Sequence, residues 1–216
     1  MTFKSVIFDL DGTLLDTLDD ISDSANAVLA RNGYPTHTKN EYRFFVGDGA
    51  PVLVRRVLPE AARTETTIQR LYQEFRSEYG RNWKTKTRPY DGVPAMLDRL
   101  GRGGFKLAVL SNKPDDFTKM CVVELLSTSR FDIVSGQRDE VPPKPDPTGA
   151  LWITRELGVI PGECMFVGDT SIDIKTAVAA GMKPVGVAWG FRPVEELESA
   201  GADRILEAPG DIFSLL

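Results

Sequence analysis

Histidine and cysteine are scarce in this chain of 216 residues, which contains one histidine and two cysteines. The single imidazole, on His37, is too little for a histidine-based metal site or a Ser-His-Asp hydrolase, and we expect it in a turn or at the surface. Cys121 and Cys164 lie far apart, each among apolar neighbours. We therefore expect two reduced cysteines in the core and neither a disulfide nor a metal pair.

Long apolar segments and an excess of positive charge are also missing. No apolar run approaches the ~18 residues of a membrane-spanning helix, and the amino terminus lacks the basic and apolar stretches of a secretion signal. The formal net charge of −5 argues against nucleic acid as a partner. We expect a soluble cytoplasmic protein, a monomer or homodimer without a membrane partner, with a locally positive site for any anionic ligand.

The chain does contain enough apolar sequence for a core, since 42% of its residues are hydrophobic and 26% are charged, as in ordinary globular proteins. Residues 16–87 carry apolar residues at helical spacing without a convincing strand, which predicts an all-helical unit. Residues 1–15 and 88–216 instead alternate short apolar strands with amphipathic helices.

That alternation predicts an α/β fold. Strands are expected at residues 6–8, 106–110, 131–134, 165–167 and 185–188, and helices at 93–100, 116–126, 148–157 and 172–180. Because these strands are continuously apolar, they favour a Rossmann-like parallel sheet with helices on both faces. The helical unit is then an insertion after the first strand.

The first predicted strand ends in two acids, Asp9 and Asp11, followed by a glycine. In extended chain, residues two apart point the same way, so the two carboxylates would share one face. At ~4 Å they would repel by roughly 4 kcal/mol at an effective dielectric near 20. A nearby cation, a proton or a reaction would relieve that repulsion, although a plain Asp-Gly turn is the alternative.

Polar residues also follow the other predicted strands: Ser111 and Asn112, then Lys144, then Asp169 and Asp173. The carboxyl ends of parallel strands meet at one sheet edge, where ligands bind. Ser111 and Asn112 are expected to open a helix, as caps or as phosphate ligands. Lys144, stiffened by nearby prolines, favours an anion. The two later acids either complement a helix dipole or, with the first pair, supply oxygen ligands for Mg²⁺.

Four segments together resemble the motifs of the haloacid dehalogenase superfamily. They are Asp9-Leu10-Asp11-Gly12-Thr13-Leu14-Leu15-Asp16-Thr17, Ser111-Asn112, Lys144-Pro145-Asp146-Pro147 and Gly168-Asp169-Thr170-Ser171-Ile172-Asp173. The resemblance covers essentially the whole chain. It implies that residues 16–87 form a small cap domain, inserted into a catalytic core of residues 1–15 and 88–216.

The resemblance also implies a Mg²⁺-dependent phosphatase that acts on a small phosphorylated metabolite through an aspartyl-phosphate. Asp9 would be the nucleophile and Asp11 the general acid and base. The metal would be held by the Asp9 side chain, the Asp11 backbone carbonyl and Asp169, with Asp173 in support. The phosphoryl oxygens would be bound by Thr13, Ser111, Asn112 and Lys144.

In the cap, Gly47, Gly49 and Arg55 resemble the pattern of phosphoglycolate phosphatases, which implies 2-phosphoglycolate as substrate. The glycines would let the backbone approach a small substrate and Arg55 would meet its carboxylate. Otherwise the glycines only break a helix and Arg55 is a solvated charge. The alternatives are another capped member of the superfamily (a pyrophosphatase, sugar phosphatase, β-phosphoglucomutase or phosphonoacetaldehyde hydrolase) or, from another class, a phospho-accepting signalling domain.

Overall fold

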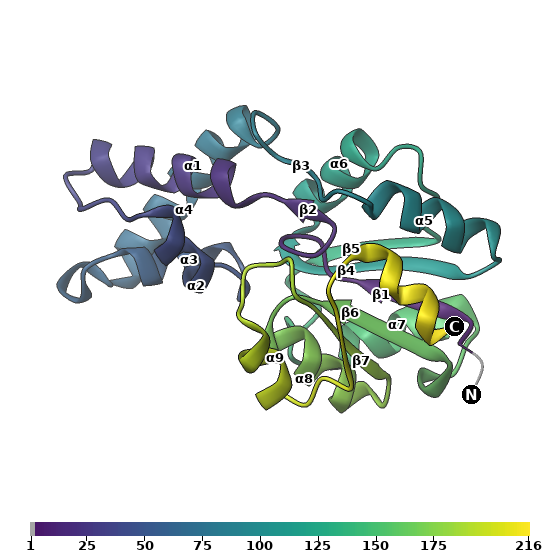
Figure 1. The fold of residues 1–216 in the computed structure, drawn as a ribbon. Helices are drawn as coiled ribbons and strands as arrows, with labels where there is room; N and C mark the ends of the chain where they lie inside the picture. Colours follow the sequence, from purple (N-terminus) through teal and green to yellow (C-terminus); the bar gives the residue numbers. More distant parts are fainter. Residues whose placement is uncertain (1–2) are drawn as a thin grey trace.

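A six-stranded sheet forms the centre of the structure, a computed structural model that describes residues 3–216 (Figure 1). The strands are β1 Ser5–Phe8, β4 Lys106–Pro114, β5 Ile133–Gln137, β6 Cys164–Gly168, β7 Lys183–Val187 and β8 Arg204–Leu206. They lie in the order β5-β4-β1-β6-β7-β8, and every neighbouring pair is parallel. The predicted parallel sheet is confirmed.

The order of the strands places β1 at the point where the sheet changes direction. The chain builds β4 and β5 on one side of β1 and then β6, β7 and β8 on the other. The segments that follow β1 and its neighbouring strands therefore run to opposite sides, which opens a crevice at the carboxyl ends of these strands. Asp9, the first residue after β1, lies at this crevice.

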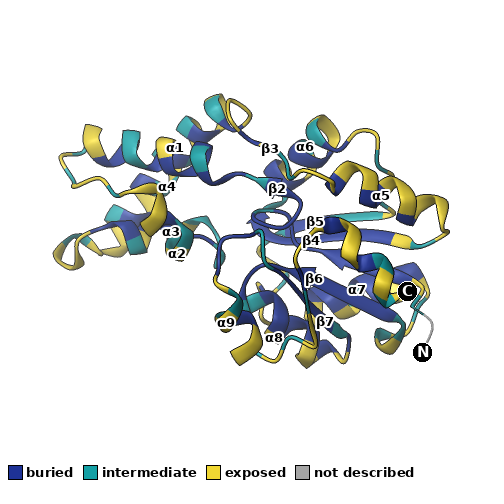
Figure 2. Cartoon of the chain, in the orientation of Figure 1, coloured by how far each residue is buried: buried dark blue, intermediate teal, exposed yellow. Residues whose placement is uncertain are grey.

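Helices cover both faces of the sheet, as predicted. They are α5 Val93–Arg102, α6 Asp115–Leu125, α7 Thr148–Leu157, α8 Ser171–Ala180 and α9 Val194–Ser199. Val6 and Phe8 of β1 pack in one core cluster with α5, whereas Ile7 packs in another with α7 and α8. All four residues of β1 are buried, which Figure 2 shows in dark blue.

The α-helices between β1 and β3 lie together to one side of the sheet (Figure 1). They are α1 Leu18–Arg31, α2 Lys39–Phe45, α3 Ala50–Val57 and α4 Glu65–Asn82, with α4 packed against both α1 and α3. The chain enters and leaves this region through two short antiparallel strands, β2 Leu15–Asp16 and β3 Arg88–Pro89. The helices expected in residues 16–87 are present, and the domain boundary itself stays a prediction.

The largest departure from the sequence-based expectation concerns Ser111 and Asn112. Both were expected to open a helix, but they lie within β4, and α6 begins only at Asp115. The strand continues because its last residue, Pro114, still pairs with Gln137 of β5 after a shift in register. These two side chains are therefore presented from an extended backbone and not from a helix N-terminus.

The other departures are small. Helix α7 spans Thr148–Leu157 as predicted, whereas the strands expected at 131–134 and 185–188 lie at Ile133–Gln137 and Lys183–Val187. Neither the short strand β8 nor the six-residue helix α9 was predicted.

His37 lies in the loop between α1 and α2 and is partly buried there. The two cysteines are buried and unpaired, as predicted. Across residues 3–216, the helices are all too short or too polar to span a bilayer.

Candidate active site

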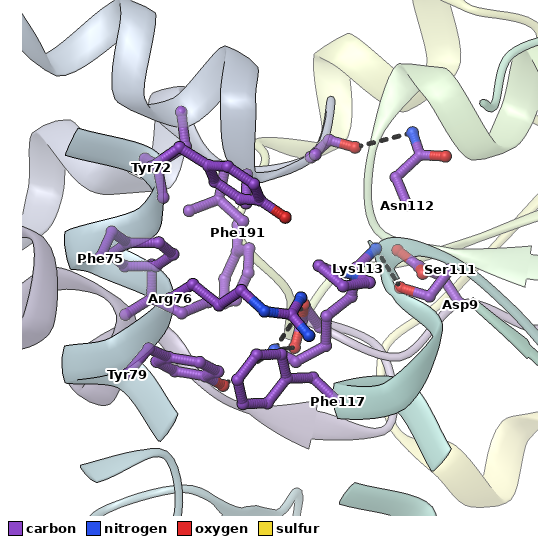
Figure 3. Close-up of a pocket in the computed structure, with 18 of the residues that line it drawn as sticks. Asp9, Tyr72, Phe75, Arg76, Tyr79, Ser111, Asn112, Lys113, Phe117 and Phe191 are labelled. Carbon is purple, nitrogen blue, oxygen red and sulfur yellow. Dashed lines mark hydrogen bonds and ion pairs between the residues drawn. The ribbon is translucent and has the colours of Figure 1, made fainter. Parts of the chain in front are cut away.

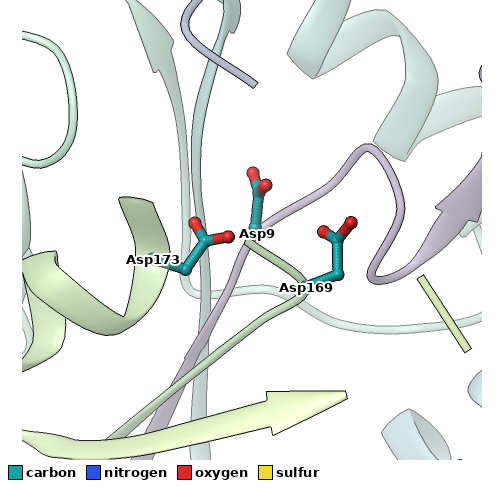
Figure 4. A group of neighbouring side chains, drawn as sticks. All are labelled: Asp9, Asp169 and Asp173. Atoms are coloured by element: carbon teal, nitrogen blue, oxygen red, sulfur yellow. The ribbon is translucent and has the colours of Figure 1, made fainter. Parts of the chain in front are cut away.

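Three buried carboxylates meet at the carboxyl edge of the sheet (Figure 4). Asp9 follows β1, Asp169 follows β6, and Asp173 lies in the first turn of α8. One oxygen of each lies within 4.8 Å of the others. The convergence expected for these three acids is therefore present.

Each of the two later acids is held by hydrogen bonds as well as by its place in the chain. Asp169 accepts the Thr13 hydroxyl on Oδ1 and the Phe191 backbone N–H on Oδ2, both at 2.9 Å. Asp173 Oδ2 caps α8 by accepting the backbone N–H and hydroxyl of Thr170 at 3.0 and 2.8 Å. The Asp173 Oδ1 atom is left to face the cluster.

The turn after β1 is shaped by its contact with Asp169. Gly12 has a φ of 87°, which glycine adopts without strain, and a Cβ there would lie 2.3 Å from Asp169 Oδ2. The Thr13 hydroxyl, expected to bind phosphate, instead donates to Asp169. In this conformation Thr13 positions an acid of the cluster.

Lys144 supplies the positive charge of the cluster. Its Nζ lies 2.6 Å from Asp173 Oδ1 and 2.9 Å from Asp9 Oδ1, and the residue is 5% exposed. Burial alone would lower the pKa of Lys144, but the carboxylates of Asp173 and Asp9 outweigh it and raise the pKa above its usual value. The lysine is therefore a fixed cation at the sheet edge.

One lysine does not balance three buried carboxylates. Burial raises the pKa of Asp9 to about 6, against the opposing effect of Lys144. Burial, together with the charges of Asp173 and Asp9, raises the pKa of Asp169 well above its usual value. Asp9 Oδ1 is also buried without a well-directed hydrogen bond, although Lys144 Nζ is close. An all-oxygen set of ligands with excess negative charge fits a hard divalent cation such as Mg²⁺.

Asn112 holds the backbone of Lys144 in place. Its amide oxygen accepts the Lys144 N–H at 2.8 Å and its Nδ2 donates to the Lys144 carbonyl at 3.0 Å. The same Nδ2 donates to the Gly47 carbonyl of the cap at 3.0 Å. Both amide hydrogens are thus engaged, so Asn112 positions Lys144 here, whereas Ser111 lines the cavity beside Asp9 (Figure 3).

Asp11 lines the same cavity as Asp9 but has a different partner. Its carboxylate receives Lys113 Nζ at 2.9 and 3.1 Å, and this Nζ also donates to the Tyr79 hydroxyl of α4 at 2.8 Å. Because β1 ends at Phe8, the two acids do not continue an extended strand as expected, and Lys113 relieves the charge of Asp11. Neither Lys113 nor Tyr79 was predicted from the sequence.

The cavity lies between the helices α1, α3 and α4 and the edge of the sheet, and encloses about 680 Å³, counting space open to solvent. Gly47 and Gly49, with φ values of 125° and 92°, line it. A Cβ on Gly49 would lie 3.3 Å from the Asn112 carbonyl oxygen. The two glycines thus bring the cap backbone against the core, and their expected approach to a substrate stays a prediction.

Arg55 is not brought to the cavity. Its side chain is 55% exposed and lies 3.7 Å from Glu65. Arg76 of α4 lines the cavity instead. The position of Arg76 could have been noticed in the sequence. Tyr72 and Arg76 are four residues apart, so they share one face of α4, and that face borders its buried residues.

Two arginines join the region of α2 to the loop after β7. Arg43 donates to the carbonyls of Phe191 and Gly190 at 2.7 and 3.2 Å. In the opposite direction, Arg192 donates to the Val46 carbonyl at 2.9 Å. The helices over the cavity are therefore docked on the core by reciprocal contacts.

A parallel α/β sheet with buried acids and a fixed lysine at its switch point, covered by helices that close a cavity, defines a capped α/β enzyme. The profile of the family described as haloacid dehalogenase-like hydrolase matches residues 6–187. The chain belongs to the haloacid dehalogenase-like hydrolases, as its four motifs predicted.

Similar proteins agree with this assignment over the whole length. The phosphoglycolate phosphatase of Xylella fastidiosa is 34% identical over 207 residues, which cover 95% of this chain and 90% of that protein. The N-acetylmuramic acid 6-phosphate phosphatase of Pseudomonas aeruginosa is 31% identical over 217 residues, covering 100% and 96%. The crystal structure of a predicted phosphoglycolate phosphatase from Haemophilus somnus matches with a TM-score of 0.93 at 29% identity, covering 100% of this chain and 98% of that one.

Proposed function

We propose that the chain is a Mg²⁺-dependent phosphatase that hydrolyses a small phosphomonoester, foremost 2-phosphoglycolate, to the alcohol and phosphate. The observation that carries the proposal is the meeting of Asp9, Asp169 and Asp173 with Lys144 at the switch point of the sheet. The phosphoglycolate phosphatases at 30–34% identity support the choice of substrate.

In the first step an oxygen of Asp9 attacks phosphorus and the ester P–O bond breaks, so that the phosphoryl group is carried on Asp9. Asp11 gives a proton to the departing alkoxide. In the second step Asp11 takes a proton from water, the water oxygen attacks phosphorus, and the bond to Asp9 breaks. The contact between Lys113 and the Asp11 carboxylate orients this acid toward the cavity that both acids line.

The metal would be held by the Asp9 side chain, the Asp11 backbone carbonyl and Asp169, with Asp173 in support. When bound, Mg²⁺ shields the negative charge of the phosphoryl group from the attacking carboxylate. Lys144 lies against Asp9 and contributes positive charge from the other side. Asp173 holds Lys144 there.

The phosphoryl oxygens would be bound by Ser111 and Lys144. Thr13 and Asn112 act one step away, since their polar groups hold Asp169 and Lys144 in this conformation. This assignment narrows the set of four residues that the sequence suggested.

Residues 16–87 would act as the cap that closes the site against water. Within this segment Asp20 of α1 accepts hydrogen bonds from the backbone N–H groups of Lys86 and Thr87, which ties the end of the segment to its first helix. The two unpaired cysteines suit a reducing compartment, and we place the protein in the cytoplasm as a monomer or homodimer.

The test is release of phosphate, with and without Mg²⁺, from 2-phosphoglycolate, sugar phosphates, nucleotides, pyrophosphate and phosphonoacetaldehyde. Asp9→Asn should abolish turnover, whereas Asp98→Asn, which changes an exposed acid of α5, should retain it. Absence of turnover on every ester, or full activity of Asp9→Asn, would refute the phosphatase. A flat, weak profile over the panel would refute only the choice of 2-phosphoglycolate.

A further inference from the structure

The cavity has a second polar end besides the acidic cluster. Arg76 extends from α4 across the cavity toward Lys113 and Phe117 (Figure 3). Its guanidinium pairs with Asp116 of α6 and lies 5.2 Å from the centre of the Phe117 ring. Arg76 therefore stands at the seam between the α4 side of the cavity and the sheet side.

Arg76 and Lys113 are the cationic side chains among the described residues that line the cavity. The three N–H donors of Lys113 are all engaged, two by Asp11 and one by Tyr79. Arg76 has five donors in a planar fork. Its partner Asp116 is 56% exposed, so the pair is weakly held and can be exchanged.

The wall around Arg76 is rich in aromatic rings. Tyr72, Phe75 and Tyr79 of α4 line the cavity with Phe117 of α6 and Phe191, and Tyr79 packs edge to face on Phe117 with ring centres 5.3 Å apart (Figure 3). Rings of this kind pack against the carbon skeleton of a ligand, and an arginine among them binds a carboxylate with two parallel hydrogen bonds. A free phosphate ion could use the arginine but not the rings, so the two features together favour a carboxylate carried on a carbon skeleton.

We propose that Arg76 binds a carboxylate carried by the alcohol part of the substrate, displacing Asp116, while the rings pack against the carbon skeleton of that alcohol. This inference rests on the proposed function, because it assigns the part of the substrate that remains after phosphate is removed. Such an alcohol is either a short hydroxy acid or a sugar that bears an acidic side arm.

Two matched pairs of esters test the inference. N-acetylmuramic acid 6-phosphate differs from N-acetylglucosamine 6-phosphate only by the lactyl ether that carries its carboxylate, and 2-phosphoglycolate differs from ethyl phosphate by its carboxylate. The quantity measured is the ratio of kcat/KM for the acidic ester to that for the neutral one. In the wild type this ratio should exceed about ten in at least one pair, since a charged hydrogen bond is lost with the carboxylate.

Arg76→Gln should lower that ratio about tenfold to a hundredfold, and Arg76→Lys should lower it less, because lysine keeps the charge but not the fork. Arg81→Gln is the matched control, on the same helix with a side chain 69% exposed. The pair with the larger kcat/KM for its acidic ester shows whether the alcohol is a sugar or a short hydroxy acid.

A ratio near one in the wild type, or a ratio that Arg76→Gln leaves unchanged, overturns the inference and leaves the phosphatase intact. If Arg76→Gln does not fold, Arg76→Lys provides the test, because lysine also loses the two-pronged contact. A kcat/KM ratio in Arg76→Lys equal to that of the wild type then overturns the inference. No turnover by the wild type on any of the four esters with Mg²⁺ refutes the proposed function instead.

Discussion

The metal-free protein should lose stability as the pH rises, and Asp9 should contribute a definite part of the loss. The pKa of Asp9 is raised from 3.8 to about 6 by burial. Between these values the unfolded chain has released a proton that the folded protein still binds, so the free energy of unfolding falls with rising pH. A difference of about two pKa units corresponds to about 3 kcal/mol once Asp9 is fully ionised.

About half of this loss in the free energy of unfolding, roughly 1.4 kcal/mol, should appear between pH 5 and pH 7.5. At pH 5 the Asp9 carboxyl is already ionised in the unfolded chain but still mostly protonated in the folded protein. For a chain of this size the loss corresponds to a fall in Tm of about 3–6 °C. Asp9→Asn removes the buried charge but leaves the pair between Lys144 and Asp173. The decisive quantity is therefore the difference in Tm between Asp9→Asn and the wild type, in EDTA, as a function of pH.

That difference should grow in favour of Asp9→Asn from pH 5 to pH 7.5. Saturating Mg²⁺ should raise the Tm of the wild type more at pH 7.5 than at pH 5, because the cation binds the ionised carboxylates. Asp98→Asn should follow the wild type throughout. A Tm difference that is constant with pH, or an equal Mg²⁺ effect on Asp9→Asn, would show that Asp9 does not hold a buried, metal-linked charge.

Three further substitutions follow from individual contacts. Gly49→Ala places a methyl group 3.3 Å from a core backbone oxygen at a φ of 92°, and should raise KM several-fold in steady-state kinetics. The control is Gly33→Ala, which strains the backbone in the same way but meets no neighbour within 4 Å. Lys113→Met removes the partner of Asp11 and should lower kcat by about ten- to a hundredfold; an unchanged kcat would exclude Lys113 as the residue that orients this acid. Asp20→Asn weakens the acceptor of the Lys86 and Thr87 backbone N–H groups and should destabilise the protein by about 1–3 kcal/mol in thermal melts, which an unchanged Tm would contradict.

The sheet and the acids at its edge were predictable because their signals are local. A buried parallel strand is apolar throughout, and the residues that follow it reach the carboxyl edge whatever the rest of the chain does. Asp9, Asp169 and Lys144 were identified in this way. Helix α7 was predicted at its observed bounds because its apolar spacing and the proline before it agree.

The extent of β4 was not predictable from such signals. Ser111 and Asn112 are common capping residues, and the pairing with β5 that keeps them in a strand joins segments more than twenty residues apart. The strand β8 has three residues, of which Arg204 is exposed, and gives no alternating pattern to detect. In both cases the tertiary partner outweighs the local preference.

The pairs that cross the cavity could not be identified from the sequence either. Lys113 meets Asp11 because β4 pairs with β1, and it meets Tyr79 because α4 packs over the edge of the sheet. Arg55 and Arg76 both lie on helices beside apolar residues, and the packing of α3 and α4 turns the first toward solvent and the second into the cavity. A motif therefore indicates the chemistry of the core, whereas the contacts between the cap helices and the core follow only from the fold.

The same seam links the position of the cap to Lys144 through one side chain. Asn112 donates from a single Nδ2 atom both to the cap, at Gly47, and to the loop that carries Lys144. Lifting the cap would break the first bond and keep the second, because the amide oxygen also accepts the Lys144 N–H. One N–H donor of Asn112 then becomes free beside the cavity at the moment when substrate can enter. Closure over a bound substrate would restore the Gly47 bond together with the contacts of Arg43 and Arg192, so Asn112 ties the position of the cap to the loop that carries Lys144.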